Sequence, residues 1–129
     1  MKLLIIDEVL DPKTDTDKQA RQFLVNLLDR LCVEKNIRPE IEYRTIAIWR
    51  RDQPPGAILI LGTPQTKVII DPRANVRNDR THIFRWGSKA PMKCTYHPSQ
   101  VLKDKRLAPY FMHDVEAVLD LLVEEEECT

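Results

Sequence analysis

Residues 2–6 read Lys-Leu-Leu-Ile-Ile, and the run ends at Asp7-Glu8. A continuous aliphatic run cut off by two carboxylates is typical of a strand that is buried on both faces. Strands of this kind occur in parallel sheets that are covered by helices. The run therefore predicts a central parallel strand in an α/β fold.

A helix is predicted next, between about residues 16 and 35. Apolar residues recur there three and four positions apart, which gives the helix one apolar face to lay on a sheet. The polar loop of residues 9–17 precedes it, and Thr14, Asp15 or Thr16 can cap its start. The apolar positions are Ala20, Phe23, Leu24, Leu27, Leu28 and Leu31.

The middle of the chain predicts two more strands and a short helix. Residues 41–49 are rich in β-branched and aromatic side chains, and residues 57–61 are aliphatic throughout, so both are expected to be strands. Residues 63–70 begin with Thr-Pro, which suits the first turn of a helix. Residues 71–80 carry five charges in ten positions and are expected to be a surface excursion.

Two short strands are expected at residues 81–86 and 91–95, followed by a last helix at about 107–125. Strands that alternate with helices in this way are typical of layered α/β folds. We therefore expect a single domain, residues 1–129, with three α/β/α layers and a central, mainly parallel four-stranded sheet. The acidic residues 124–129 are expected to form a frayed tail.

Charge is distributed unevenly along the chain. Its 20 basic and 20 acidic residues cancel, but residues 44–106 hold thirteen basic and four acidic residues, a net charge of +9. Residues 107–129 hold seven acidic residues and no basic one. A basic middle can contact a polyanion, or it can be a solvated surface.

Two features of the sequence bear on where in the cell the protein is expected. They are its cysteines and its lack of a long apolar run. Cys32, Cys94 and Cys128 are far apart and form no Cys-x-x-Cys pair, so neither a disulfide framework nor a zinc site is expected. No apolar run approaches the ~20 residues of a membrane span, and the start of the chain is too short for a signal peptide. We expect a cytoplasmic protein.

The stretch Thr95-Tyr96-His97-Pro98-Ser99 is the strongest candidate for a functional site. It follows an apolar strand, and Pro98 restricts its own φ and favours extended geometry at His97. The imidazole is therefore expected to be held where a strand passes into a loop, a common position for functional residues. The alternative is a hydrogen-bonded structural histidine.

This stretch resembles the DNA-intercalating loop of the uracil-DNA glycosylase superfamily. The most similar pattern is that of family 4, in which Tyr-His-Pro-Ala/Ser is followed by leucines. Weaker likenesses occur in the same order along both sequences. They are Asp7-Glu8-Val9-Leu10-Asp11 for the family's Gly-Glu-Ala-Pro-Gly, Leu27-Leu28-Asp29-Arg30-Leu31 for Leu-Leu-Asp-x-Leu, Tyr43-Arg44-Thr45-Ile46 for Tyr-x-Thr-Asn, and Leu61-Gly62 for the end of a strand.

The resemblance implies roles for individual residues. Glu8 matches the glutamate of the first family motif and His97 the loop histidine, so these two are the implied catalytic residues. An alternative alignment places Asp11-Pro12 on the Asp-Pro of the family 1 motif, which would make Asp11 the water activator. Phe23 is the candidate for stacking on the base. The implied contacts to nucleic acid are Arg50, Arg51, His97, Pro98, Ser99, Val101, Leu102 and Lys103.

Departures from the family pattern indicate a degenerate active site. Asp7 and Asp11 replace glycines where backbone must approach the base, and Ile46 replaces the asparagine that reads it. Val9 and Leu10 replace Ala-Pro. The cysteines that hold the family's iron-sulfur cluster are absent, with Arg50 at one of their positions, so no cofactor and no metal are expected.

Three functions remain open on the sequence. The first is a nucleic-acid-binding protein of glycosylase fold with a decayed active site, an accessory or replication-associated factor of the phage type. Its partners would be single- or double-stranded DNA and a replication or repair protein, and a phage-encoded chain would act in the host cytoplasm. The second is an active glycosylase that excises uracil or a modified base. The third is a protein-interaction module that does not bind nucleic acid.

Overall fold

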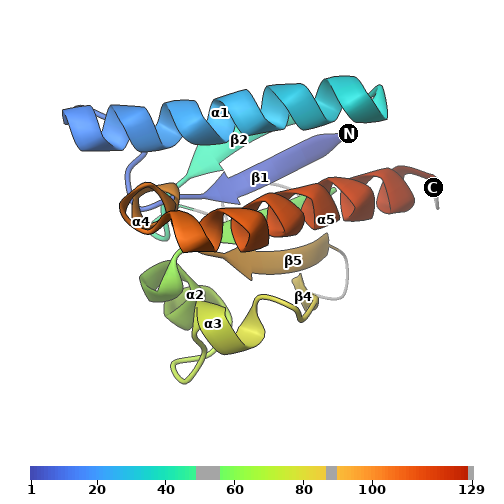
Figure 1. Ribbon diagram of the computed structural model, residues 1–129. Coiled ribbons are helices and arrows are strands. Elements are labelled where there is room, and N and C mark those ends of the chain that lie inside the picture. The colour runs from blue at the N-terminus through green and yellow to red at the C-terminus, as the bar shows by residue number, and fades with distance from the viewer. Residues whose placement is uncertain (49–55, 87–89, 128–129) are drawn as a thin grey trace.

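The computed structural model describes residues 1–48, 56–86 and 90–127. Five strands form one sheet in the order β2-β1-β3-β5-β4 (Figure 1). The elements along the chain are β1 (Lys2–Ile6), α1 (Asp15–Lys35), β2 (Glu40–Arg44), β3 (Ala57–Leu61), α2 (Thr63–Ile69), α3 (Val76–Asp79), β4 (Phe84–Trp86), β5 (Ala90–Thr95), α4 (Pro98–Lys103), the 3-10 helix η1 (Lys105–Leu107) and α5 (Ala108–Glu127).

The sheet is mainly parallel, as the sequence predicts. β2, β1, β3 and β5 run parallel to one another, and β4 pairs antiparallel with β5 at the edge. The sheet thus has five strands where four were expected. All five residues of β3 are buried, and so are the last four of β1, which confirms that the aliphatic runs are central strands.

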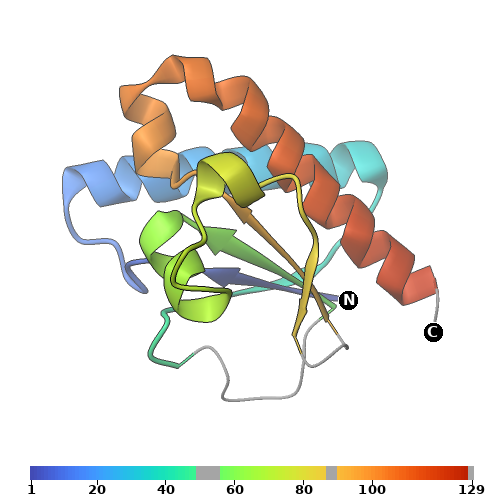
Figure 2. The ribbon, with the colours of Figure 1, turned by 90° about the horizontal axis from the view of Figure 1, so that it is seen from below.

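Helices cover both faces of the sheet (Figure 2). One face packs against α1, α4 and α5 through a cluster that includes Leu3, Leu59, Leu28 and Phe111. The other face packs against α2 and α3, and Ile58 and Val76 belong to its cluster. Alternate residues of each central strand point to opposite faces, so each aliphatic run contributes to both clusters.

The first helix begins and ends as its sequence suggests. Thr14 is the N-cap, and its hydroxyl oxygen accepts a hydrogen bond from the Asp17 amide at 3.1 Å. Asn36 ends the helix in the left-handed region, with φ 54°, and its amide donates to the carbonyls of Cys32 and Val33. A helix of 21 residues with both ends satisfied is a firm support for the face that it covers.

Three local expectations differ from the structure. β2 ends at Arg44, where its pairing with β1 ends, and a turn follows in which the Ile48 amide donates to the Thr45 carbonyl. Residues 71–80 are more than a surface excursion, because they include α3, and Val76 of this helix and Ala74 just before it are buried. The segment after His97 is helical at once, since Pro98 occupies the first turn of α4.

Parallel strands bring their carboxyl ends to one edge of the sheet, which we name the carboxyl edge. Asp7 follows β1, Gly62 follows β3, and Tyr96-His97 follow β5 at this edge. In parallel sheets, ligands bind outside the carboxyl ends of the strands. The fold therefore gathers at one edge the residues on which the site depends. Among the described helices, none combines the length and apolar character needed to cross a membrane.

Candidate functional site

His97 is the N-cap of α4. It has extended geometry, with φ −68° and ψ 139°, and the Ser99 amide donates a hydrogen bond of 3.1 Å to its Nδ1. The proline that follows fixes this arrangement, because it favours extended geometry at the preceding residue and suits the first turn of a helix. The imidazole is thus held at the start of α4, close to the end of β5.

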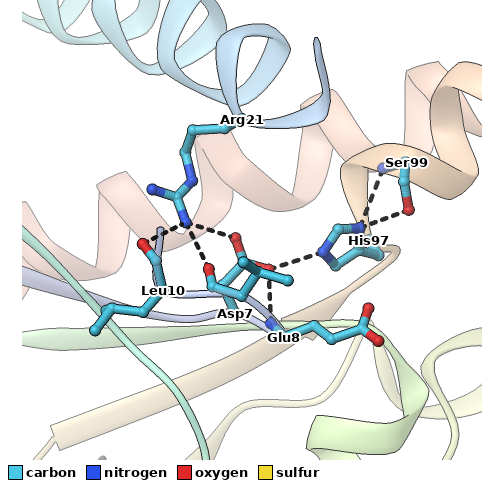
Figure 3. Close-up of polar contacts among 7 residues, drawn as sticks. Asp7, Glu8, Leu10, Arg21, His97 and Ser99 are labelled. Carbon is cyan, nitrogen blue, oxygen red and sulfur yellow. Dashed lines mark hydrogen bonds and ion pairs between the residues drawn. The ribbon is translucent and has the colours of Figure 1, made fainter. Parts of the chain in front are cut away.

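Asp7, which follows β1, forms a hydrogen bond with His97 (Figure 3). Its carboxylate is almost fully buried, and Oδ1 lies 2.8 Å from His97 Nε2. The same oxygen accepts a hydrogen bond of 2.6 Å from the Glu8 amide, and Oδ2 accepts one of 3.0 Å from the Arg21 guanidinium. Asp7 thereby connects the ends of β1 and β5 with α1.

The hydrogen bonds fix the tautomer of His97. Because the Ser99 amide donates to Nδ1, that nitrogen carries no proton, and Nε2 carries the proton that it donates to Asp7. The Ser99 hydroxyl also lies 2.8 Å from Nδ1. Both ring nitrogens are therefore engaged inside the protein, and neither is free to accept a proton from a ligand.

Arg21 reaches this network from the second turn of α1. Besides the Asp7 carboxylate, its terminal nitrogen donates to the Val9 carbonyl at 2.9 Å. Its guanidinium carbon lies 3.9 Å from the centre of the Tyr43 ring, a cation–π contact. Arg21 thus holds the loop after β1 against α1 and β2.

Two ionisable groups of the site have shifted pKa values. Burial alone would raise the pKa of the Asp7 carboxyl, but the hydrogen bond from His97 and the charge and hydrogen bond of Arg21 outweigh it, so the pKa lies below its ordinary value. Burial raises the pKa of the Tyr43 phenol. Asp7 is therefore an ionised, acceptor-only group at neutral pH.

A glycine allows the chain after β3 to pass close to His97. Gly62 has φ 90°, a region that other residues rarely adopt, and its amide donates to the Thr95 carbonyl at 2.9 Å. A Cβ atom there would lie 3.5 Å from the His97 Cβ and 3.1 Å from the Gln65 amide oxygen. Glycine is favoured at this position by its φ, while the contact distances themselves leave room for a Cβ atom once the Gln65 side chain shifts slightly.

The Asp7–His97–Ser99 chain has the connectivity of a Ser-His-Asp triad but not its roles. In a triad the imidazole accepts the serine proton on a nitrogen that is otherwise free. Here Nδ1 already accepts the Ser99 amide, and Ser99 lies only two residues from His97 in the same helical turn. The arrangement is that of a helix cap joined to a buried carboxylate.

No family model matches the chain, and no curated protein matches it. The likeness to uracil-DNA glycosylases rests on the motifs and stays a prediction. Within the described residues no three His, Cys, Asp or Glu side chains are grouped so that they could hold a metal ion.

The two other carboxylates proposed for catalysis are not part of this network. Glu8 is exposed, and its side chain extends away from the Asp7 carboxylate (Figure 3). Asp11 is exposed in the loop after β1. The described residues thus place Asp7, and neither of these two, in contact with His97.

The residues predicted to contact DNA differ in exposure, and His97 and Ser99 are partly buried. Pro98 and Val101 are buried, Val101 within the cluster beneath α1 and α5, so they anchor α4. Leu102 and Lys103 are exposed on the same helix. Arg50 and Arg51 lie outside the described residues.

The predicted base-stacking and base-reading positions lie elsewhere. The Phe23 ring is partly buried and stacks on Phe111, with ring centres 5.6 Å apart. Ile46 is exposed in the turn after β2. Phe23 of α1 thus packs against α5, and its role in base stacking stays a prediction.

Many cations of the basic middle are already paired within the protein. Arg80 binds Asp114, Arg85 binds Glu125, and Arg44 binds Glu42. Arg106 binds Asp104. Within residues 44–106, the described cations that make no ion pair with another described residue are Lys67, Arg73, Arg77, Lys103 and Lys105.

The pairing of Asp7 with Arg21 is a feature that sequence reasoning missed. A signal for it exists, because Arg21 lies three and seven positions before Leu24 and Leu28, on the apolar face of α1. A cation on an apolar helix face requires a buried anion. Asp7, the first acidic residue after a buried strand, is the nearest candidate.

Proposed function

We propose that this chain is a nucleic-acid-binding protein of uracil-DNA glycosylase fold whose active site is degenerate. The observation that supports it is the state of His97, whose two ring nitrogens are engaged by Asp7 and Ser99. A histidine bound in this way positions α4 and is not available as an acid, a base or a donor to a developing charge. Binding then depends on what α4 exposes at the carboxyl edge.

α4 offers one apolar and one cationic side chain to a DNA strand. Leu102 is 38 % exposed and Lys103 has no ion pair among the described residues. An exposed apolar side chain next to a cation can insert between bases while the cation contacts a phosphate. As an accessory or replication-associated factor of the phage type, the chain would act in the cytoplasm with a replication or repair protein.

A binding titration with edge variants tests this function. Leu102→Asp and Lys103→Glu are expected to weaken binding of fluorescein-labelled single- and double-stranded oligonucleotides about equally for different sequences, since they remove non-specific contacts. Val33→Asp and Arg38→Glu are matched controls, because Val33 is exposed in the last turn of α1 and Arg38 is exposed between α1 and β2, both at the opposite edge. Equal losses in the control and edge variants would contradict the proposal.

An active glycosylase is the second candidate, because Asp7 and His97 lie 2.8 Å apart at the carboxyl edge. We expect no release of uracil, even at stoichiometric protein. Ile46, at the position that the resemblance assigns to base reading, is apolar and exposed in the turn after β2, so it cannot supply the hydrogen bonds that would select a base.

Abasic-site formation on uracil-containing oligonucleotides measures this activity. The native chain is compared with His97→Ala and Glu8→Gln. Multiple turnovers that disappear in either variant would mean that the site is catalytic, and the degenerate-site proposal would fail.

A further inference from the structure

A pocket separate from the Asp7–His97 network lies between α3 and the segment from α4 to the start of α5. Its volume is about 550 Å³, within the range of pockets that hold small ligands. Figure 2 shows α3 next to the arch that α4, η1 and the first turns of α5 form. The side chains that matter here are Arg77, Tyr96, Gln100, Asp104, Arg106 and Tyr110.

Two tyrosines give the pocket aromatic surface. Tyr96 follows β5 and is partly buried, while Tyr110 in the first turn of α5 is 52 % exposed. The Arg80 guanidinium carbon lies 4.8 Å from the centre of the Tyr110 ring. Arg80 is itself fixed by two hydrogen bonds of 2.9 Å to the buried Asp114 carboxylate. The Tyr110 ring is therefore held in place before a ligand arrives.

Two arginines give the pocket positive charge. Arg77 is exposed and makes no ion pair within the described part of the chain. Arg106 binds the Asp104 carboxylate through Nε and one terminal nitrogen, at 2.9 Å and 3.0 Å, which leaves its other terminal nitrogen to donate. Lys103 and Lys105, next to Asp104 in the sequence, are also without ion pairs among the described residues. This charge favours a ligand that carries a phosphate.

An amide adds groups that can bind the edge of a base. Gln100 is exposed on α4, and no hydrogen bond engages its side chain within the described residues. Its amide offers a donor and an acceptor together. An aromatic surface, an amide and two guanidinium groups around one pocket match a ligand with an aromatic ring, polar ring edges and a phosphate.

We infer that this pocket binds a nucleoside phosphate, either as a free nucleotide or as one nucleotide of a single strand. The ring stacks on Tyr110 or Tyr96, and the phosphate is bound by Arg77 and Arg106. The inference goes beyond the proposed function, because a free nucleotide can bind here whether or not α4 contacts DNA. The Asp7–His97 network takes no part in it.

Isothermal titration calorimetry with AMP, adenosine and inorganic phosphate tests the pocket. AMP is expected to bind more tightly than adenosine or phosphate, because only AMP engages the tyrosines and the arginines together. Arg77→Glu and Tyr110→Leu are each expected to weaken AMP binding about tenfold. Arg38→Glu is the charge-matched control at the opposite edge, and thermal melts establish that each variant is folded.

Oligonucleotide titrations separate the two sources of the ligand. If Arg77→Glu also weakens binding of a ten-residue oligothymidylate, the pocket holds a nucleotide of a strand; if only AMP binding falls, it holds a free nucleotide. Either result supports the pocket. AMP binding that equals that of phosphate, or that is unchanged in both variants, would overturn the inference. The proposed function is tested separately by the Leu102 and Lys103 variants, so the two can fail independently.

Discussion

His97 joins the ends of two strands through a single side chain. Its Nε2 donates to Asp7 after β1, and its Nδ1 accepts from Ser99 in α4, so one imidazole connects β1, the exit from β5 and a helix. A buried carboxylate that accepts three hydrogen bonds stabilises the folded protein only while all three donors are in place. The stability of this part of the protein is therefore expected to depend on the charge of Asp7.

Asp7→Asn is expected to destabilise the protein by about 1–3 kcal/mol at pH 7, since it removes the charge that Arg21 and His97 bind. The pKa of Asp7 is lowered in the folded state, so its carboxylate stabilises the fold fully above the ordinary carboxyl pKa of 3.8. This stabilisation is lost as the pH falls through the lower, folded-state pKa. Urea denaturation at several pH values measures the difference between the native chain and the variant.

Asp11→Asn is the control for this experiment, because Asp11 is exposed four residues away in the same loop. It is expected to change the free energy of unfolding by less than ~0.5 kcal/mol. Two results would contradict the account of Asp7. One is an Asp7→Asn variant as stable as the native chain at pH 7, and the other is a difference that grows as the pH falls.

The residues of the site could be predicted from the sequence only in part. His97 at a strand exit was recognisable because a proline restricts its own φ and favours extended geometry at the residue before it. The sequence could not decide whether Asp7 or Glu8 contacts His97, because both carboxylates follow the same strand. Only the orientation of the strand end determines which of the two points inward. The contact of Asp7 with His97 joins positions 90 residues apart, and no local pattern encodes it.

At the scale of the elements, a buried ionic network connects α3, β5 and α5. Asp114 of α5 is fully buried and accepts two hydrogen bonds from Arg80 and one of 2.6 Å from the Thr95 hydroxyl. Lys93 Nζ lies 3.9 Å from the same carboxylate, and burial lowers the pKa of this lysine. The network fixes both α3 and the start of α5, between which the nucleotide pocket lies.

Asp114→Ala is expected to cost about 3–5 kcal/mol, because it leaves Arg80 and Lys93 without their anion. Asp120→Ala on the same helix is the matched control. Asp120 binds Lys35 at 2.6 Å, but its side chain is 54 % exposed, so its loss is expected to cost less than ~1 kcal/mol. Thermal and urea denaturation measure both values. Equal losses for the two variants would contradict the role assigned to the network.

Long periodic elements were predictable, and short ones were not. The apolar spacing of α1 and the aliphatic runs of β1 and β3 specify these elements by themselves. α3 has four residues and α4 has six, too few for a period, and both form because Asn75 and His97 cap them and Val76 and Val101 are buried. Such helices depend on tertiary packing, which the sequence does not display.

For the whole molecule, the distribution of charge matters more than its sum. The net charge of +9 in residues 44–106 is an attribute of the sequence, but several of these cations are bound to carboxylates of the protein itself. The described cations without an ion pair lie in α2, just before α3, in α3, in α4 and in η1. DNA binding would therefore depend on a few phosphate contacts and not on a broad basic face.

The dependence of DNA binding on salt tests the central claim most directly. Each phosphate contact makes log K fall by ~0.9 for each log unit of salt, so two or more contacts predict an affinity loss of roughly tenfold or more between about 50 and 250 mM NaCl. Fluorescence anisotropy with a labelled oligonucleotide measures this slope, and Lys103→Glu is expected to reduce it. Absence of binding at low salt, or an affinity that does not change with salt, would contradict the claim and favour a protein-interaction module.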